Sequence, residues 1–384
     1  MLRTKGVKRR ARWELALALA AILILFCTAP VHAKAETPAP ELSAGGAALL
    51  EGGSRTVLYA QTAHEKLPMA STTKIMTALL ALEHCDLDEV ITIPREACGV
   101  EGSSMYLSVG EEVTVGDLLH GLMLVSGNDA AVALAIHIGG SVEGFAELMN
   151  ARARELGARN THFVTPNGLH DPQHYTTAYD LALIAAKAME REDFRRIVSS
   201  EYYKTSSGSV IRTLKNKNRL LWEYEGGCGV KTGYTKNAGK CLVFAAEREG
   251  MLLIGVVLKC YDMFPAAEAL LDYGFEQYEM TAVIRAGEPV ARIRIKGAEK
   301  TVLALLAEND IMIPVKSGSG ASLRTEVELN DSAAAPIGKD QALGLVRVTH
   351  EGRVIGQARL IAAEAVEPPD YGYYFNRLAQ MWSA

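Results

Sequence analysis

Apolar residues are grouped along the chain in a way that predicts a mixed helix and strand domain. Residues 47–50 and 56–60 are short apolar runs separated by a segment with two glycines, so we expect a β-hairpin. Strand-forming residues predict further antiparallel strands at 229–235, 239–245 and 252–258. Segments rich in helix formers predict helices at 71–83, 116–124, 130–138, 145–156, 179–185 and 265–273, the last capped by Gly274.

After about residue 278 the pattern changes to short segments in which apolar and polar residues alternate, with glycines between them. Residues 291–296 and 345–348 are examples, and the pattern predicts a small all-β domain over 281–365. The first domain should therefore span 36–280. The tail, residues 366–384, is aromatic and weakly amphipathic, so it is expected either to lie in a membrane interface or to form a packed or frayed end.

The first 35 residues have the organisation of a secretory signal peptide. A basic start is followed by an apolar run from Leu15 to Cys27, which is short for a membrane span, and then by Ala33-Lys34-Ala35. We expect cleavage after Ala35; cleavage after Ala33 and lipidation at Cys27 are the alternatives. The protein is accordingly predicted to be extracytoplasmic.

Charge and cysteine usage exclude several classes of protein. Seven of the 40 Lys and Arg and one of the 45 Asp and Glu lie in residues 1–35, so the remainder carries a formal charge of −11 and is not a nucleic-acid binder by charge. Five cysteines remain, an odd number without C-x-x-C spacing, which argues against a disulfide framework or a zinc site. His170, Asp171 and His174 are residue types that bind metals, but the prolines and glycine around them favour a rigid surface loop. No metal or cofactor is expected.

Three short motifs carry the candidate chemistry. Ser71 and Lys74 are three residues apart at the start of a predicted helix, which places both side chains on one face. Ser-x-x-Lys alone is common on helix surfaces, but Ser126-Gly127-Asn128 and Lys231-Thr232-Gly233 follow in the chain. The three motifs in this order are the signature set of penicillin-recognising enzymes.

In their longer sequence contexts these motifs resemble the D-alanyl-D-alanine carboxypeptidases, the low-molecular-mass penicillin-binding proteins. The similar blocks are 68–79, 126–131, 174–182, 229–235 and 270–275. The resemblance implies an α/β (α+β sandwich) fold of the β-lactamase and DD-peptidase type, with a five-stranded antiparallel sheet flanked by helices and followed by the small all-β domain. It also implies peptidoglycan stem peptides ending in D-Ala-D-Ala as substrates, and β-lactams as covalent inhibitors.

The same resemblance implies roles for the residues of the first two motifs. Ser71 would be the nucleophile and Lys74 its general base, with Asn128 holding Lys74 and the substrate amide. A lysine acts as a base only if its pKa falls, and burial beside the second cation Lys231 would lower it. Ser126 and Lys231 would pass a proton to the departing amine.

The remaining implied contacts concern the oxyanion and the substrate carboxylate. The backbone N–H groups of Ser71 and Tyr234 would form the oxyanion hole, and Thr232, followed by Gly233, would bind the terminal carboxylate. Some family members place an arginine before the K-T-G motif to bind that carboxylate, and Lys217 is at the matching position here. Arginine can bind a carboxylate through two parallel hydrogen bonds, whereas lysine offers a compact charge without that fixed geometry.

Other functions fit the sequence less well. A class A β-lactamase shares the motifs but uses a glutamate in an E-x-x-L-N context before K-T-G; no such context occurs here, and residues 168–177 contain no glutamate. A catalytically silent wall-associated scaffold is disfavoured because every expected catalytic side chain is present. An α/β-hydrolase is excluded because the chain contains no G-x-S-x-G.

Overall fold

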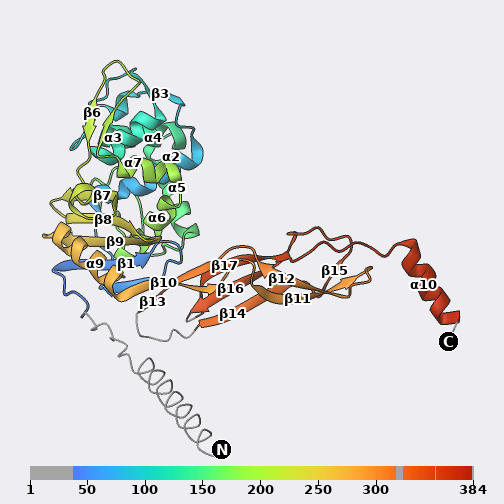
Figure 1. The fold of residues 1–384 in the computed structure, drawn as a ribbon. Helices are drawn as coiled ribbons and strands as arrows, with labels where there is room; N and C mark the ends of the chain where they lie inside the picture. The colour runs from blue at the N-terminus through green and yellow to red at the C-terminus, as the bar shows by residue number, and fades with distance from the viewer. Residues whose placement is uncertain (1–37, 317–322, 351, 383–384) are drawn as a thin grey trace, which may run out of the picture. The chain divides into compact units, whose positions relative to one another are not determined.

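The computed structural model describes residues 38–316, 323–350 and 352–382, so the predicted signal peptide lies outside the described residues. The first domain is built on a five-stranded sheet in the order β2-β1-β9-β8-β7, with every neighbouring pair antiparallel (Figure 1). Its strands are β1 (Ala44–Glu51), β2 (Val57–Gln61), β7 (Gly227–Thr235), β8 (Gly239–Arg248) and β9 (Met251–Cys260). The predicted hairpin and the three later strands are confirmed.

The sheet is covered on both faces because its central strands are apolar on both sides. In β8, Leu242 and Phe244 belong to the core shared with α9 (Met263–Gln277), while Val243 and Ala245 belong to the core shared with the other helices. The predicted cap at Gly274 is wrong. The helix continues three residues further, and a Cβ at Gly274 would lie 2.6 Å from the Leu253 side chain, so close packing on the sheet accounts for this glycine.

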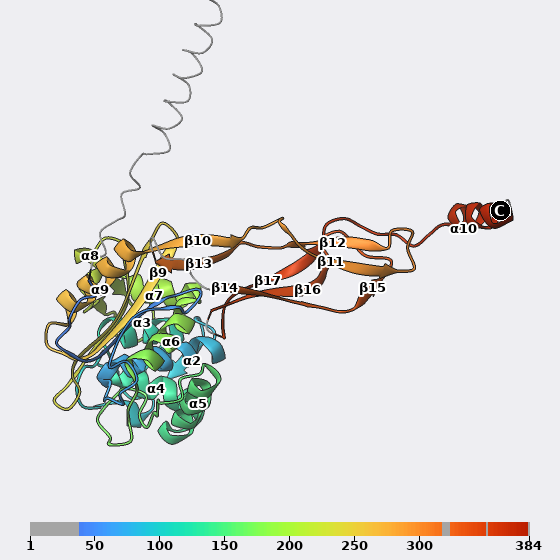
Figure 2. The same ribbon diagram turned by 90° about the horizontal axis from the view of Figure 1, so that it is seen from below.

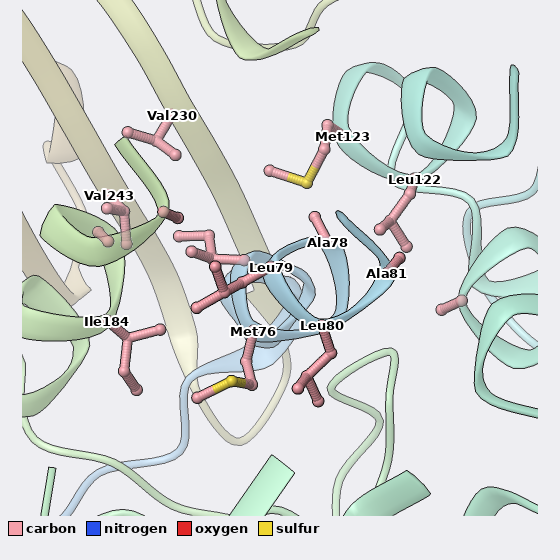
Figure 3. Packing of buried hydrophobic residues seen from close by; sticks show 14 of the residues in the cluster. Met76, Ala78, Leu79, Leu80, Ala81, Leu122, Met123, Ile184, Val230 and Val243 are labelled. Carbon is pink, nitrogen blue, oxygen red and sulfur yellow. The ribbon is translucent and has the colours of Figure 1, made fainter. Parts of the chain in front are cut away.

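The second layer is a group of helices around α2 (Lys74–His84), which is buried from its first residue to Leu82. Side chains of α2 point toward Leu122 and Met123 on one side and toward Ile184, Val230 and Val243 on the other (Figure 3). The other helices of this layer are α3 (Val115–Leu124), α4 (Asn128–Gly139), α5 (Val142–Glu155), α6 (Ala178–Met189) and α7 (Glu192–Ser199). All except α7 were predicted.

Several short elements escaped the sequence analysis because tertiary contacts, rather than local patterns, hold them. The hairpin of β5 (Tyr202–Lys204) and β6 (Thr213–Lys215) is tied to α3 by the buried carboxylate of Asp117, which accepts hydrogen bonds from the backbone N–H groups of Ser206 and Ser207. The other short elements are β4 (Glu112–Thr114), α8 (Leu220–Glu223) and the 3-10 helix η2 (Arg95–Ala97). By contrast, β3 (Val90–Thr92) confirms a short β run that the sequence predicts at 90–93, and the 3-10 helix η1 (Ala70–Thr73) overlaps the start of the helix predicted at 71–83.

Residues 278–366 are entirely β in the parts that the structure describes, with one strand pair β10-β13 and a six-stranded sheet in the order β14-β16-β17-β12-β11-β15 (Figure 2). Alternating residues such as Leu303 and Leu305 fill the interior of this domain. Its strands are β10 (Tyr278–Ile284), β11 (Pro289–Lys296), β12 (Val302–Ala307), β13 (Ile311–Lys316), β14 (Leu323–Leu329), β15 (Ser332–Ala334), β16 (Ala342–His350) and β17 (Arg353–Ala362).

The tail forms a helix, α10 (Tyr371–Trp382). Among the described helices, none by itself is long and apolar enough to cross a membrane; α4 and α5, bent by 82° at their junction, pass that test only as a pair and by length and composition alone. The first eight residues of α4 are buried in the helical layer, as expected for a core helix.

Candidate active site

The turn that carries Ser71 is the 3-10 helix η1, which leads directly into α2 at Lys74. Strand β7 lies against this turn: a Cβ placed on Gly233 would be 3.1 Å from the backbone nitrogens of both Ser71 and Thr72. A side chain at this position would therefore be in tight contact with the turn, and glycine lets β7 approach it closely. This contact also brings the backbone N–H groups of Ser71 and Tyr234 to the same part of the molecule.

Lys74 is completely buried, and its Nζ has three oxygen partners. It lies 3.1 Å from Ser71 Oγ, 2.7 Å from Asn128 Oδ1 and 2.7 Å from the Asn167 carbonyl oxygen. Burial, followed by the positive charges of Lys231 and Lys217, holds the pKa of Lys74 well below its usual value. A neutral amine beside a serine hydroxyl is the arrangement that a general base requires.

Ser126 and Asn128 lie at the N-terminal end of α4, where both side chains are nearly buried. Ser126 has a φ of +66°, a left-handed conformation that is uncommon for residues other than glycine. The Asn128 amide group donates to the Glu101 carbonyl oxygen at 2.5 Å, and its backbone N–H donates to the Ser103 carbonyl oxygen at 2.7 Å. Asn128 therefore connects Lys74 to the loop 101–108.

The buried carboxylate of Asp129 organises the same loop. It accepts hydrogen bonds from the Ser104 hydroxyl and from the backbone N–H groups of Met105 and Leu107. These contacts fix the position of Ser103, which faces the cleft. The sequence analysis missed Asp129, although it directly follows the predicted Ser-x-Asn motif.

Lys231 and Lys217 add two further cations to the site. Lys231 is 1% exposed, its Nζ donates to the Thr232 carbonyl oxygen at 3.0 Å, and burial together with Lys217 lowers its pKa to about 7. The Nζ of Lys217 donates to Ser103 Oγ at 3.1 Å, and burial lowers the pKa of Lys217 as well. Because its pKa is near neutrality, Lys231 can gain and lose a proton under physiological conditions.

A cleft of about 450 Å³ opens over these groups. It brings together six of the predicted site residues and leaves Lys74, Asn128 and Lys231 buried in its floor. The residues that line it are Ser71, Ser103, Ser126, Lys217, Thr232, Gly233, Tyr234, Lys240 and Met263. Ser103, Lys240 and Met263 were not predicted. Lys240 could have been found, because it lies opposite Tyr234 in the predicted hairpin of β7 and β8.

The loop 165–174 packs against η1, the turn that carries Ser71, so the prediction of a surface loop is wrong for much of its length. Pro166, Asn167 and Gly168 are buried. Gly168 has a φ of +83°, and a Cβ there would lie 1.9 Å from the Ala70 carbonyl oxygen. Close packing against the turn before Ser71 therefore requires glycine at this position.

His174 connects this loop to η1. Among the described residues it does not belong to a group of potential metal ligands. It is 4% exposed, its Nε2 lies 2.8 Å from Thr73 Oγ1, and its Nδ1 accepts from the Val164 N–H. Burial lowers the pKa of His174 to about 4, so the ring is neutral near pH 7. His170, by contrast, is exposed. Proline and glycine spacing identified a rigid loop but gave no signal for what it contacts.

Comparison with known proteins gives consistent matches over both domains. Residues 32–262 match the family model "D-alanyl-D-alanine carboxypeptidase", and residues 278–368 match "Penicillin-binding protein 5, C-terminal domain". The chain is 33% identical over 350 residues to D-alanyl-D-alanine carboxypeptidase DacF of Bacillus subtilis, covering 88% of this chain and 90% of that protein. It is 40% identical over 258 residues to a Streptomyces D-alanyl-D-alanine carboxypeptidase, covering 62% and 88%. Penicillin-binding protein 5 of Haemophilus influenzae has a similar crystal structure, with a TM-score of 0.68, 32% identity and coverage of 86% of this chain and 99% of that one.

Proposed function

Because the chain belongs to the D-alanyl-D-alanine carboxypeptidase family, we propose that it removes the terminal D-alanine of peptidoglycan stem peptides through an acyl intermediate on Ser71. It is a serine-type D-Ala-D-Ala carboxypeptidase, a hydrolase of the penicillin-binding protein class. One observation carries the assignment of Ser71: its hydroxyl lies 3.1 Å from the Nζ of a wholly buried lysine whose pKa is strongly lowered.

In the acylation step, neutral Lys74 takes the hydroxyl proton of Ser71 while Oγ attacks the carbonyl carbon between the two D-alanines. The oxyanion that forms is stabilised by the backbone N–H groups of Ser71 and Tyr234. Such donors act most strongly in a site from which water is largely excluded. The buried floor of the cleft, formed by Lys74 and its neighbours, provides those surroundings.

The leaving D-alanine needs a proton on its amine before the C–N bond breaks. Ser126 lines the cleft, and Lys231 is buried beneath it with a pKa of about 7, so the two together are suited to deliver that proton. Lys74 then passes the proton that it took from Ser71 to Ser126 and Lys231, which makes its amine neutral again. Water attacks the ester carbonyl of the acyl-enzyme as Lys74 takes a proton from it, and Lys74 gives that proton to Ser71 Oγ when the ester bond breaks.

The terminal carboxylate of the substrate is proposed to bind where lysine side chains line the cleft. Thr232 supplies a hydroxyl, and Lys217 and Lys240 are the two lysines among the residues that line the cleft. A lysine gives a point charge without the fixed geometry of an arginine fork, so these side chains would attract the carboxylate rather than set its angle.

Incubation of the purified chain with a pentapeptide ending in D-Ala-D-Ala tests the activity. The expected product, found by mass, lacks one alanine. Ser71→Ala should abolish both this product and covalent labelling by a fluorescent penicillin while the fold remains, because the hydroxyl forms the bond and contributes little to packing. Product formation or wild-type labelling by this variant would refute the assignment of Ser71.

The proposed location of the protein rests on its proposed substrate, on the predicted signal peptide and on the helix α10. We propose that it acts outside the cytoplasm after cleavage near Ala35, with residues 36–280 as the catalytic domain and 281–365 as the β domain.

We also propose that α10 contacts the membrane surface, since Tyr371, Phe375 and Trp382 are largely exposed on it. Loss of co-sedimentation with anionic lipid vesicles after deletion of 371–384 would support this contact, and unchanged sedimentation would contradict it.

A further inference from the structure

Three side chains with different metal-binding chemistry meet at the opposite ends of the two helices that carry the catalytic residues. Cys85 caps the C-terminus of α2, His137 is in the last turn of α4, and Glu89 follows four residues after Cys85. The thiol sulfur, a ring nitrogen and a carboxylate oxygen of these residues all lie within 4.8 Å of one another. We propose that they bind a zinc ion, with water as the fourth ligand.

The ligand set suits zinc in kind and in number. Zinc takes a thiolate sulfur at about 2.3 Å, an imidazole nitrogen at about 2.0 Å and a carboxylate oxygen at about 2.1 Å, and it accepts three protein ligands with a water in a tetrahedral site. Ligand atoms around such an ion are roughly 3 to 4 Å apart. The three ligand atoms here lie within 4.8 Å of one another, so small side-chain rotations would bring them to the distances that zinc requires. The side chains of His137 and Glu89 are 33% and 39% exposed, which leaves a path for the ion.

The surroundings independently favour a cation. The C-terminal ends of α2 and α4 converge here, and each contributes the negative end of a helix dipole. Asp86 and Asp88 add acidic side chains in the segment between Cys85 and Glu89. His137 Nε2 and Glu89 Oε1 are 2.7 Å apart as an ion pair, and the Cys85 thiol is hydrogen bonded to Glu89 as well, so the three side chains already form one connected group.

Bound zinc would connect the two helices at the ends away from the reaction. Lys74 begins α2 and Asn128 begins α4, and their side chains are hydrogen bonded. With 11 residues in α2, the zinc site lies about 16 Å from that contact along the helix axis. The ion is therefore expected to stabilise the helical layer without taking part in the acyl transfer. Cysteine spacing gave no hint of the site, because the ligands come from separate segments.

The wild-type protein alone provides the first test. The chain has free cysteines at five described positions, Cys85, Cys98, Cys228, Cys241 and Cys260. Zinc chloride should raise the melting temperature by a few degrees in a concentration-dependent manner. It should also slow the reaction of one cysteine with a thiol reagent, and peptide mass analysis should identify that residue as Cys85. Absence of protection, or protection of a different cysteine, would overturn the proposal.

Variants separate the zinc site from the existing ion pair. Equilibrium dialysis against zinc chloride should give one ion per chain for the wild type and for the matched control Cys98→Ser. Affinity should fall at least tenfold in Cys85→Ser, which keeps the ion pair, and in His137→Gln. Cobalt(II) should give a thiolate charge-transfer band with the wild type and not with Cys85→Ser. Unchanged zinc affinity in Cys85→Ser would refute the site.

Penicillin labelling of the same samples reports the fold and Ser71 acylation separately from zinc. Labelled Cys85→Ser that binds no zinc supports the site. Failure of the wild type to be labelled would instead count against the proposed function.

Discussion

The side chains of Lys74 and Asn128 are joined by a hydrogen bond of 2.7 Å between residues 54 positions apart in the chain. Each residue is the first of its helix, α2 and α4, and each is at least 96% buried. Asn128 thereby restricts the Lys74 amine to a position within reach of Ser71 Oγ, and its own amide is held by the Glu101 carbonyl. The two motifs thus form one unit, in which the second sets the geometry of the first.

Replacement of Lys74 by arginine should be nearly as damaging as replacement by alanine. Arginine keeps the positive charge but does not lose its proton near neutral pH, so it cannot act as the base. The rate constant of labelling by a fluorescent penicillin should fall by about 10²- to 10⁴-fold in both variants. Substantial activity of Lys74→Arg would mean that the role of the lysine is electrostatic only.

The pH dependence of acylation should be bell-shaped. Lys74 must be neutral, so kcat/KM falls as acid protonates its amine, whose pKa is strongly lowered. Lys231 must carry a proton, so kcat/KM also falls as the pH rises through its pKa of about 7. In Lys231→Arg the alkaline fall should move far upward, because the guanidinium keeps its proton. An alkaline limb that stays near pH 7 in this variant would assign it to another group.

Gly168→Ala should slow acylation although it removes no chemical group. The new Cβ would lie 1.9 Å from the Ala70 carbonyl oxygen and would displace the turn that carries Ser71. We expect the rate constant of penicillin labelling to fall by about tenfold or more, equivalent to at least about 1.4 kcal/mol in barrier.

Gly157→Ala is the matched control for this substitution. Gly157 also has a positive φ, +82°, but no atom lies within 4 Å of its added Cβ. It should lose only about 1 kcal/mol of stability from the backbone conformation and keep the wild-type rate constant. Equal labelling rates for the two variants would show that the contact with Ala70 is unimportant for the site.

Removal of either cleft lysine should weaken substrate binding more than it slows chemistry. Lys217→Ala and Lys240→Ala should each raise the KM for a D-Ala-D-Ala peptide by about tenfold, or about 1.4 kcal/mol, with kcat changed by less than about threefold. Lys236→Ala serves as the control, because Lys236 is exposed in the turn between β7 and β8. If neither cleft variant alters KM, the carboxylate is bound without these charges.

The penicilloyl-enzyme should persist for minutes or longer. A class A β-lactamase clears this ester with a water activated by glutamate, and none of the nine residues that line the cleft here is Asp or Glu. The peptide acyl-enzyme should clear faster, because its D-alanine has departed and leaves room for water. Release can be followed by mass after a brief exposure to penicillin. Rapid and repeated hydrolysis of penicillin would favour the β-lactamase alternative.

The sequence by itself determined the elements and the chemistry that local patterns encode. Ser71 and Lys74 are three residues apart, so helix geometry alone places them on one face, and the structure gives 3.1 Å between their reactive atoms. The strands around Lys231-Thr232-Gly233 were predicted because their apolar runs are bounded by turn residues. The roles of Ser126, Asn128 and Lys231 came from the resemblance of their motifs to a known family, not from spacing.

The tertiary structure decided what lies beside these residues. The Asn167 carbonyl on Lys74, the His174 ring on Thr73 and the Gly168 contact with Ala70 join segments that are about 100 residues apart, and no periodicity encodes such a pairing. The same holds for the proximity of Cys85, Glu89 and His137, which depends on two helices ending side by side. The lowered pKa values of Lys74 and Lys231 likewise follow from burial. Burial is a property of the packed chain, because it depends on every segment that excludes water from the site.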